Sequence, residues 1–310
     1  MYSKSFRHLV AVVLALFLSD SRTCAQDFRV TLLGTGNPTP LLTRFGPSIL
    51  IQAGDETLVF DVGRGAAQRL YQLGIPFQSI DAVFLTHLHS DHIVGLPDLW
   101  LTGWLVGRTS SPLKLIGPAG TTEMARYLEK AFAFDVRMRT EDGGQAAAGG
   151  HISPRDVVQG LVYEEHGVRV TAFDVDHGIV KPALGYRIEY RGHVVVLSGD
   201  TRFSQNLIEF SKGTDLLIHE VVLAPTGITS SSRGYRAFAH HTTPEQAAEV
   251  FSRVKPKLAV YSHIVSLGGL KDEELILRTR PLYPGPFEIG EDLMTFVVAD
   301  SVRTEGPKRN

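Results

Sequence analysis

The sequence is poor in cysteine and has no excess of charge of either sign. Its 310 residues include a single cysteine, Cys24, which excludes a scaffold held by intramolecular disulfides. The 31 basic and 33 acidic residues give a formal net charge of −2, without the basic excess that a dedicated nucleic-acid scaffold usually carries. Hydrophobic residues make up 43% of the chain, so we expect an ordinary globular protein with a sizeable core.

The chain also lacks an apolar run long enough to cross a bilayer. An uninterrupted apolar segment, 9–18, has ten residues, whereas a spanning helix needs about 20. Lys4 and Arg7 precede this segment, and a short polar stretch follows it up to Ala25, which is the layout of a signal peptide. We therefore expect cleavage after Ala25 and a secreted or periplasmic protein.

Removal of residues 1–25 would leave 28 of the 31 basic and 32 of the 33 acidic residues, a formal charge of −4, and no cysteine. Such a protein is held together by its core, with bound metal as a further source of stability. We expect one domain over residues 26–302, followed by a solvated tail over residues 303–310.

Local patterns predict an alternation of strands and helices. Strands are predicted where runs of Val, Ile, Leu or Phe are bounded by Gly or Pro, at 28–33, 48–53, 57–61, 82–85, 113–116, 168–175, 183–190, 194–197, 216–219 and 258–262. Helices are predicted at 66–73, 96–106, 121–134, 207–210 and 244–254. Residues 139–156 favour a surface loop, and Arg191-Gly192 a hairpin turn. The pattern indicates an α/β fold in which two sheets pack together with helices outside.

The strongest chemical signal is a histidine-rich motif directly after a predicted buried strand. His87, His89, Asp91 and His92 lie within six residues, and imidazole and carboxylate are ligands that zinc takes at about 2.0–2.2 Å. Spacing by two places His87 and His89 on the same side of an extended turn, so both can reach one ion. Asp91 and His92 then point elsewhere and can serve a second ion.

Three later residues could complete such a site. His177, Asp200 and His263 each lie where a predicted strand gives way to a loop, which is where scaffolds display functional groups. One such residue would more often be structural, but three with the same placement favour a shared role.

These residues resemble the H-x-H-x-D-H signature of the metallo-β-lactamase superfamily, and the resemblance covers essentially the whole chain after residue 25. Within the superfamily the chain is similar to ribonuclease Z and to arylsulfatase-like and β-lactamase-like proteins related to it. The supporting matches are Gly34-Thr35-Gly36 with Pro38, Phe60-Asp61-Val62-Gly63, Gly117-Pro118, His219-Glu220 and His241-Thr242-Thr243.

The resemblance implies an αββα sandwich, with two mixed β-sheets and helices on the outside, and two zinc ions per chain. The implied ligands are His87, His89 and His177 for the first ion, Asp91, His92 and His263 for the second, and Asp200 between the two. Asp61 would hydrogen-bond a ligand imidazole or its loop and fix its orientation, while a helix cap is the alternative role for this residue.

Such a site is typical of a hydrolase. Two zinc ions that share a carboxylate lower the pKa of a shared water, which can then attack phosphorus, sulfur or a carbonyl carbon. Asp91 could accept the proton of that water. His241 could donate a proton to the leaving group, with Glu220 holding its ring and His240 as the competing donor.

Several substrate classes remain open. Export favours a phosphate or sulfate ester, as in phosphodiesterases and arylsulfatases, while lactones and β-lactams are the first alternative. Ribonuclease Z cleavage of precursor tRNA is the second alternative; it is opposed because only 22 residues separate His177 from Asp200, which leaves no room for a tRNA-binding arm. A non-catalytic metal-binding protein is the third, opposed by the complete ligand set.

Contacts to the substrate are harder to predict from the sequence. Arg108, Tyr235 and Arg236 are candidates because they follow the metal motif or precede His241, and arginine suits a small anionic ester. Trp100 and Trp104 could line the same cleft, but their helical i,i+4 spacing favours a place in the core. Whether residues 229–236 form a lid, and whether the protein is a homodimer, stay open.

The export prediction can be tested on the full-length chain produced in a bacterial host. Because the basic start and apolar segment resemble a signal peptide, protein that begins at Gln26 should appear outside the cytoplasm. N-terminal sequencing of each cell fraction measures this. Intact Met1 on cytosolic protein would contradict the prediction and would favour a tRNA substrate.

Overall fold

The computed structural model describes residues 27–306. The predicted signal peptide lies outside the described residues. Among the described residues, no helix has the length and apolar character needed to cross a membrane.

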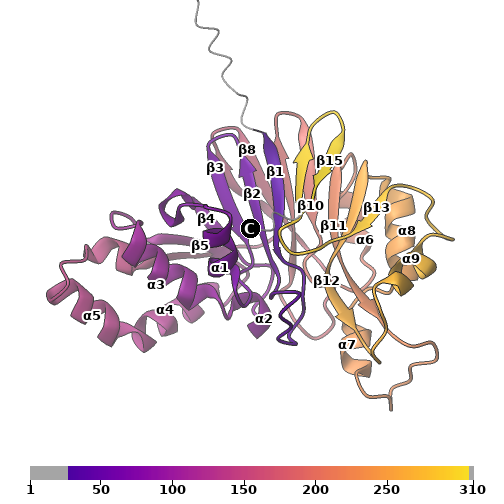
Figure 1. Ribbon diagram of the computed structural model, residues 1–310, viewed down its shortest axis with the longest axis horizontal. Coiled ribbons are helices and arrows are strands. Elements are labelled where there is room, and N and C mark those ends of the chain that lie inside the picture. Colours follow the sequence, from indigo (N-terminus) through magenta and orange to yellow (C-terminus); the bar gives the residue numbers. More distant parts are fainter. Residues whose placement is uncertain (1–26, 307–310) are drawn as a thin grey trace, which may run out of the picture.

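Two mixed β-sheets pack face to face and form the centre of the molecule (Figure 1). The first sheet contains, in spatial order, β15 (Val302–Glu305), β14 (Thr295–Val298), β1 (Phe28–Gly34), β2 (Ser48–Ala53), β3 (Glu56–Phe60), β4 (Ala82–Phe84), β5 (Leu113–Gly117) and β6 (Ile152–Asp156). The second sheet contains β13 (Phe287–Ile289), β12 (Leu258–Ser266), β11 (Leu216–Leu223), β10 (His193–Leu197), β9 (Leu184–Tyr190), β8 (Val168–Asp174) and β7 (Gly160–Glu165).

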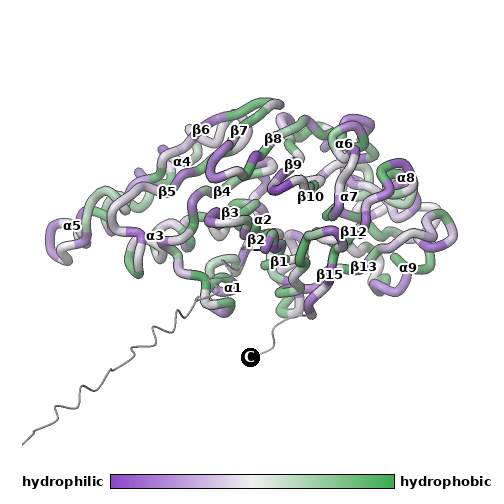
Figure 2. The backbone as a smooth tube through the Cα atoms, turned by 90° about the horizontal axis from the view of Figure 1, so that it is seen from above, coloured by the Kyte–Doolittle hydropathy of each residue, from purple (hydrophilic) through white to green (hydrophobic). Residues whose placement is uncertain are grey.

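Helices cover the outer faces of both sheets. The first half of the chain supplies α1 (Ala66–Gln72), α2 (Ser90–Ile93), α3 (Leu96–Val106), α4 (Thr121–Ala131) and α5 (Ala133–Glu141), with short 3-10 turns η1 (Phe77–Ser79) and η2 (Ala147–Gly150). The second half supplies α6 (Gln205–Phe210), α7 (Tyr235–His240), α8 (Pro244–Val254) and α9 (Glu273–Thr279). Seen from above, α3, α4 and α5 lie at one end of the molecule and α8 and α9 at the other (Figure 2).

Three apolar layers hold this arrangement together. The central layer lies between the sheets and includes Phe60, Phe84 and Tyr186, whose rings contact one another. The two outer layers lie between each sheet and its helices. Central strands are thus buried on both faces, which explains why they are continuous apolar runs rather than alternating ones. The αββα sandwich that the sequence predicts is confirmed.

The tight turn after β9 is also confirmed. Arg191 and Gly192 have φ of 50° and 80°, the backbone that a two-residue hairpin turn requires, and Tyr190 pairs with His193 across it. Leu184, at the other end of β9, donates its backbone N–H to the carbonyl of Thr86, next to the histidine-rich motif. The hairpin turn therefore lies at the edge of the sandwich opposite that motif.

Two sequence-based boundaries are wrong. Residues 139–156, expected to be a loop, contain the end of α5, η2 and the whole of β6, which pairs in parallel with β5 as an edge strand. Residues 303–305, expected to belong to a solvated tail, lie in β15, which pairs with β14. The edge strands β6 and β15 are polar, and α5 has no buried residue. Their sequences therefore lack the apolar periodicity from which strands and helices are predicted.

Candidate metal centre

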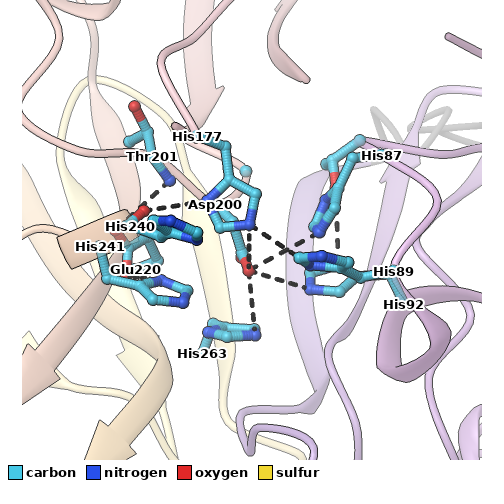
Figure 3. Close-up of polar contacts among 12 residues, drawn as sticks. His87, His89, His92, His177, Asp200, Thr201, Glu220, His240, His241 and His263 are labelled. Carbon is cyan, nitrogen blue, oxygen red and sulfur yellow. Dashed lines mark hydrogen bonds and ion pairs between the residues drawn. The ribbon is translucent and has the colours of Figure 1, made fainter. Parts of the chain in front are cut away.

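Five parts of the chain bring ligand side chains to one edge of the sandwich (Figure 3). The loop after β4 carries His87 and His89, and α2 carries Asp91 and His92. The remaining ligands come from the second sheet: His177 follows β8, Asp200 follows β10, and His263 lies within β12.

The ligand atoms form two groups within which all lie less than 4.8 Å apart. One group is His87, His89, His177 and Asp200, and the other is Asp91, His92 and His263. The second group is the set that the sequence resemblance implies for one ion, and the first is the set that it implies for the other together with Asp200. A third combination, Asp200 with His241 and His263, meets the same distance limit.

Asp200 lies between the two groups. Its Oδ2 is 3.8 Å from Nε2 of His87 and 3.9 Å from Nε2 of His177 on one side. On the other side it is 3.4 Å from Nε2 of both His92 and His263. One carboxylate oxygen is therefore placed to be shared by two ions.

Three buried polar atoms of this cluster have no hydrogen-bond partner among the described residues, as expected of atoms that bind a metal ion. These atoms are Nε2 of His87, Nε2 of His92 and Oδ1 of Asp200. Unpaired buried polar atoms are costly, so an ion that occupies them accounts for their placement. Ligands of one tetrahedral zinc ion at about 2.0–2.2 Å would lie about 3.3–3.6 Å from each other, comparable with the separations around Asp200. The cluster fits a metal site.

The other ring nitrogen of three ligands is fixed by hydrogen bonds. Nδ1 of His177 donates to the backbone carbonyl of His240 at 2.9 Å, which leaves Nε2 as the free base. Nδ1 of His92 lies 2.8 Å from Oδ2 of Asp61. Nδ1 of His87 lies 3.0 Å from Oγ1 of Thr86. In each case Nε2 points into the cluster, as metal ligation requires.

Asp61 organises the motif from the end of β3. Its carboxylate accepts hydrogen bonds from the backbone N–H of Thr86 at 2.8 Å and from the hydroxyl of Thr86 at 2.9 Å, in addition to the ring of His92. Asp61 has a φ of 57°, an unusual backbone for a residue other than glycine. The contacts are those of an orienting residue and not of a helix cap.

Burial and neighbouring charge set the protonation of the ligands. Burial lowers the pKa of His87 well below its ordinary value and also lowers that of His177, so both rings are neutral near pH 7. Burial opposes the charged form of His92, but the carboxylates of Asp200 and Asp61 outweigh it and raise the pKa of this histidine. A bound cation would take the place of the proton that His92 otherwise holds.

A histidine–glutamate pair lies beside the cluster. Nδ1 of His241 is 3.0 Å from Oε2 of the buried Glu220, and the other oxygen of Glu220 accepts from the backbone N–H of Thr242 at 2.8 Å. Thr243 then caps α8 in a capping box with Gln246. Burial opposes protonation of His241, but Glu220 outweighs it and raises the pKa of His241 to about 9.

Of the three predicted substrate contacts, Arg108 lies away from the cluster, whereas Tyr235 and Arg236 lie at the same edge of the sandwich. Arg108 as a cleft residue is wrong: its side chain is buried and donates to the carbonyls of Trp100 at 2.9 Å and Gly149 at 3.3 Å, so it joins α3 to η2. Closeness in sequence to the metal motif does not place it there, because α3 leads the chain away. Trp100 and Trp104 are both in the core.

The other two candidates lie on α7, which projects from the same edge as the cluster (Figure 1). Arg236 is exposed, and Tyr235 is half-buried near the ring of Phe238. Their contact with a substrate stays a prediction.

Sequence reasoning missed two groups that orient the ligands. Thr86 precedes the motif directly and could have been singled out by its hydroxyl. The carbonyl of His240 carries no sequence signal, since any residue supplies one, and it reaches His177 from 63 residues away.

Comparison with known proteins identifies relatives of this chain. The family model described as "Anti-Pycsar protein Apyc1" matches residues 28–233. A ribonuclease Z from Mycolicibacterium gilvum (strain PYR-GCK) is 36% identical over 270 residues, which cover 85% of this chain and 94% of that protein.

Solved structures share the fold. The metallo-β-lactamase fold protein YhfI from Bacillus subtilis has a TM-score of 0.68 and 20% identity, over 90% of this chain and 100% of that one. Zn²⁺-bound PqqB from Methylobacterium extorquens has a TM-score of 0.64 and 17% identity, over 87% of this chain and 100% of that one.

The shared position of Asp200 predicts that both metal sites depend on it. Replacing Asp200 by Ala should remove at least one ion per chain and nearly all hydrolase activity, because it deletes the carboxylate that lies between the two groups. Metal content per chain is measured by plasma mass spectrometry. Asp135→Ala, which changes a half-exposed carboxylate on α5, is the control and should keep the wild-type metal content. Full activity of metal-stripped wild-type protein would contradict the assignment.

Proposed function

The chain belongs to the metallo-β-lactamase-fold hydrolases, in the family of the anti-Pycsar protein Apyc1, and has ribonuclease Z relatives. We propose that it hydrolyses phosphodiesters with two zinc ions bound per chain. The observation that carries this proposal is the carboxylate of Asp200, which lies between two sets of ligands beside an acid–base pair. Paired metal sites suit displacement at phosphorus. Phosphate is favoured over sulfate because a ribonuclease, the named activity of the relative, cleaves phosphodiester bonds.

The proposed ligands are the seven residues of the two groups; Asp200, of the first group, also lies 3.4 Å from His92 and His263 of the second and would be shared by both ions. When bound, two such ions supply a water nucleophile at neutral pH and neutralise charge on phosphoryl oxygens. Asp91 serves as the base, because its Oδ2 faces the cluster 3.2 Å from Nε2 of His263. Although burial opposes its ionisation, the hydrogen bond from His263 helps to lower the pKa of Asp91, so that its carboxylate is ionised.

His241 serves as the acid. As the water oxygen bonds to phosphorus, the bond from phosphorus to the leaving oxygen breaks, and that oxygen leaves with the electron pair. His241 gives its proton to the leaving oxygen, while Asp91 takes the proton of the water. Glu220 holds the ring of His241 through Nδ1, so that Nε2 is the atom that donates.

We further propose that the substrate is a small ester and that the protein is exported. Between His177 and Asp200 the chain forms a short loop and the β9–β10 hairpin, whose turn lies at the opposite edge of the sandwich. The shortness of this segment at the edge that carries the cluster supports a small substrate over a large nucleic acid. Ribonuclease Z activity is the second candidate, because the chain matches 94% of the length of a ribonuclease Z.

A substrate panel tests the proposed function. The metal-loaded enzyme should hydrolyse bis(p-nitrophenyl) phosphate faster than an aryl sulfate, a homoserine lactone or a chromogenic cephalosporin, and should cut precursor tRNA poorly. The same assays with Asp200→Ala protein show the background. Efficient, position-specific cleavage of precursor tRNA would replace the small-ester proposal by the second candidate, and preference for the lactone would overturn phosphoester hydrolysis.

The role of His241 predicts a dependence on the leaving group. In His241→Ala protein, turnover should fall little for p-nitrophenyl esters, whose leaving group departs as a stable anion. For alkyl or unactivated phenyl esters it should fall by about 10²–10⁴-fold, the usual contribution of a general acid. Glu220→Gln should give a milder version of the same pattern, because the ring would be held less firmly.

Metal content and turnover of each variant distinguish proton donation by His241 from substrate positioning and from metal ligation. His193→Ala, at the hairpin turn on the opposite edge, is the matched control and should behave as wild type. An equal loss across all leaving groups would mean that His241 positions the substrate instead. Loss of metal on the same change would make His241 a ligand, as its place in the third combination allows.

A further inference from the structure

His263 differs from the other buried ligand histidines in how its ring is held. Nδ1 of His263 has no hydrogen-bond partner among the described residues, whereas the rings of His87, His92 and His177 are each fixed through Nδ1. A ligand without such a bond must be oriented by its backbone. The direction of the His263 imidazole therefore depends on the conformation of β12 at this residue.

That conformation is strained. His263 has a φ of 43°, in the left-handed region that side-chain-bearing residues rarely adopt. It is the extra residue of a β-bulge: Ser262 pairs with Glu220 and Ile264 with Val221, so no residue of β11 stands opposite His263. A strained bulge persists only when neighbouring groups hold it in place.

A loop from the other sheet supplies those groups. The backbone N–H of Ile264 donates to the carbonyl of Thr35 at 3.0 Å. The backbone carbonyl of Ile264 accepts from Nδ2 of Asn37 at 2.7 Å. Both polar groups that follow the bulge are thus taken by the segment directly after β1, across the junction of the two sheets.

Asn37 is itself fixed. Its Oδ1 accepts from the backbone N–H of Thr39 at 2.9 Å, which closes a local turn. The two bonds determine the orientation of the amide, because the reverse orientation would face oxygen toward the Ile264 carbonyl and nitrogen toward the Thr39 N–H.

The segment that carries Asn37 is anchored at its base. One oxygen of the buried Asp292 accepts from the backbone N–H and the hydroxyl of Thr35, at 3.0 and 2.8 Å. The other accepts from the backbone N–H of Phe45 at 2.7 Å and from Arg69 at 2.9 Å. Both ends of the loop are therefore tied to one carboxylate, and Asn37 donates from a rigid support.

We propose that Asn37 is a positioning residue for the metal ligand His263. Its amide holds the Ile264 carbonyl, which keeps the bulge in its left-handed form and aims Nε2 of His263 at the carboxylates of Asp91 and Asp200, at 3.2 and 3.4 Å. The inference rests on the proposed function in one respect, since it takes His263 as a ligand of the second ion.

Asn37→Asp is the sharpest test. The new carboxylate still accepts from the Thr39 N–H, but it places an acceptor opposite the Ile264 carbonyl and removes the donor. One of the two ions should be bound about 10–100-fold more weakly, the usual cost of losing a contact that orients a ligand. Zinc per chain is measured after dialysis against graded chelator. At the chelator concentration that just leaves wild type with two ions, the variant should keep about one.

Two further variants and a spectroscopic readout complete the design. Thr39→Ala keeps the backbone N–H and should match wild type, while Asn37→Ser removes the amide without adding charge and should also weaken one ion. In the cobalt-substituted proteins, the visible absorption of one site should change in both Asn37 variants. Lower thermal stability with unchanged metal affinity and unchanged cobalt spectra would overturn the proposal. Wild type that binds fewer than two ions would instead overturn the proposed function on which it rests.

Discussion

The carboxylate of Asp200 is the point on which the rest of the site depends. Nε2 atoms of four histidines surround its Oδ2, at 3.4 Å for His92 and His263 and at 3.8 and 3.9 Å for His87 and His177. Two of these rings come from the first sheet and two from the second. A buried carboxylate is unfavourable unless charge and hydrogen bonds compensate it, so the cluster is stable only as a unit. The packing of one sheet on the other therefore sets the distances within the metal centre.

The four rings around this carboxylate are oriented by different means. His177 is held by a backbone carbonyl, His92 by a carboxylate and His87 by a hydroxyl, all through Nδ1. His263 has no such bond among the described residues and depends on a strained backbone held by a loop. Three of these supports lie close to the ligands that they orient in the fold but far from them in the sequence. The orientation of each ligand ring thus depends on a different part of the tertiary structure.

The sequence predicts the ligands better than their supports. His87, His89, Asp91 and His92 form a local motif after an apolar strand, and their grouping follows from spacing within a few residues. Three of the four supports are distant in the sequence from the ligand that they orient, and one of them, the carbonyl 63 residues from His177, has no side-chain chemistry to mark it.

The same limit applies to Arg108 and to the edge strands. Arg108 follows the motif in the sequence, which predicts a place at the cleft, but the direction of α3 carries it into the packing against η2. Edge elements such as β6 and β15 are polar and give no apolar pattern, so only their pairing with a neighbour identifies them.

Several segments outside the metal cluster lie at the same edge of the sandwich. Residues 178–183 form a short loop at this edge, and β9 then leads the chain to a turn at the opposite edge. A large substrate could therefore be gripped at this edge only by other elements, such as α7, which has no buried residue. Surface segments of this kind change readily without disturbing a core. The His241–Glu220 pair and all members of the cluster except the exposed His89 are buried or nearly so, and the two sheets fix their positions.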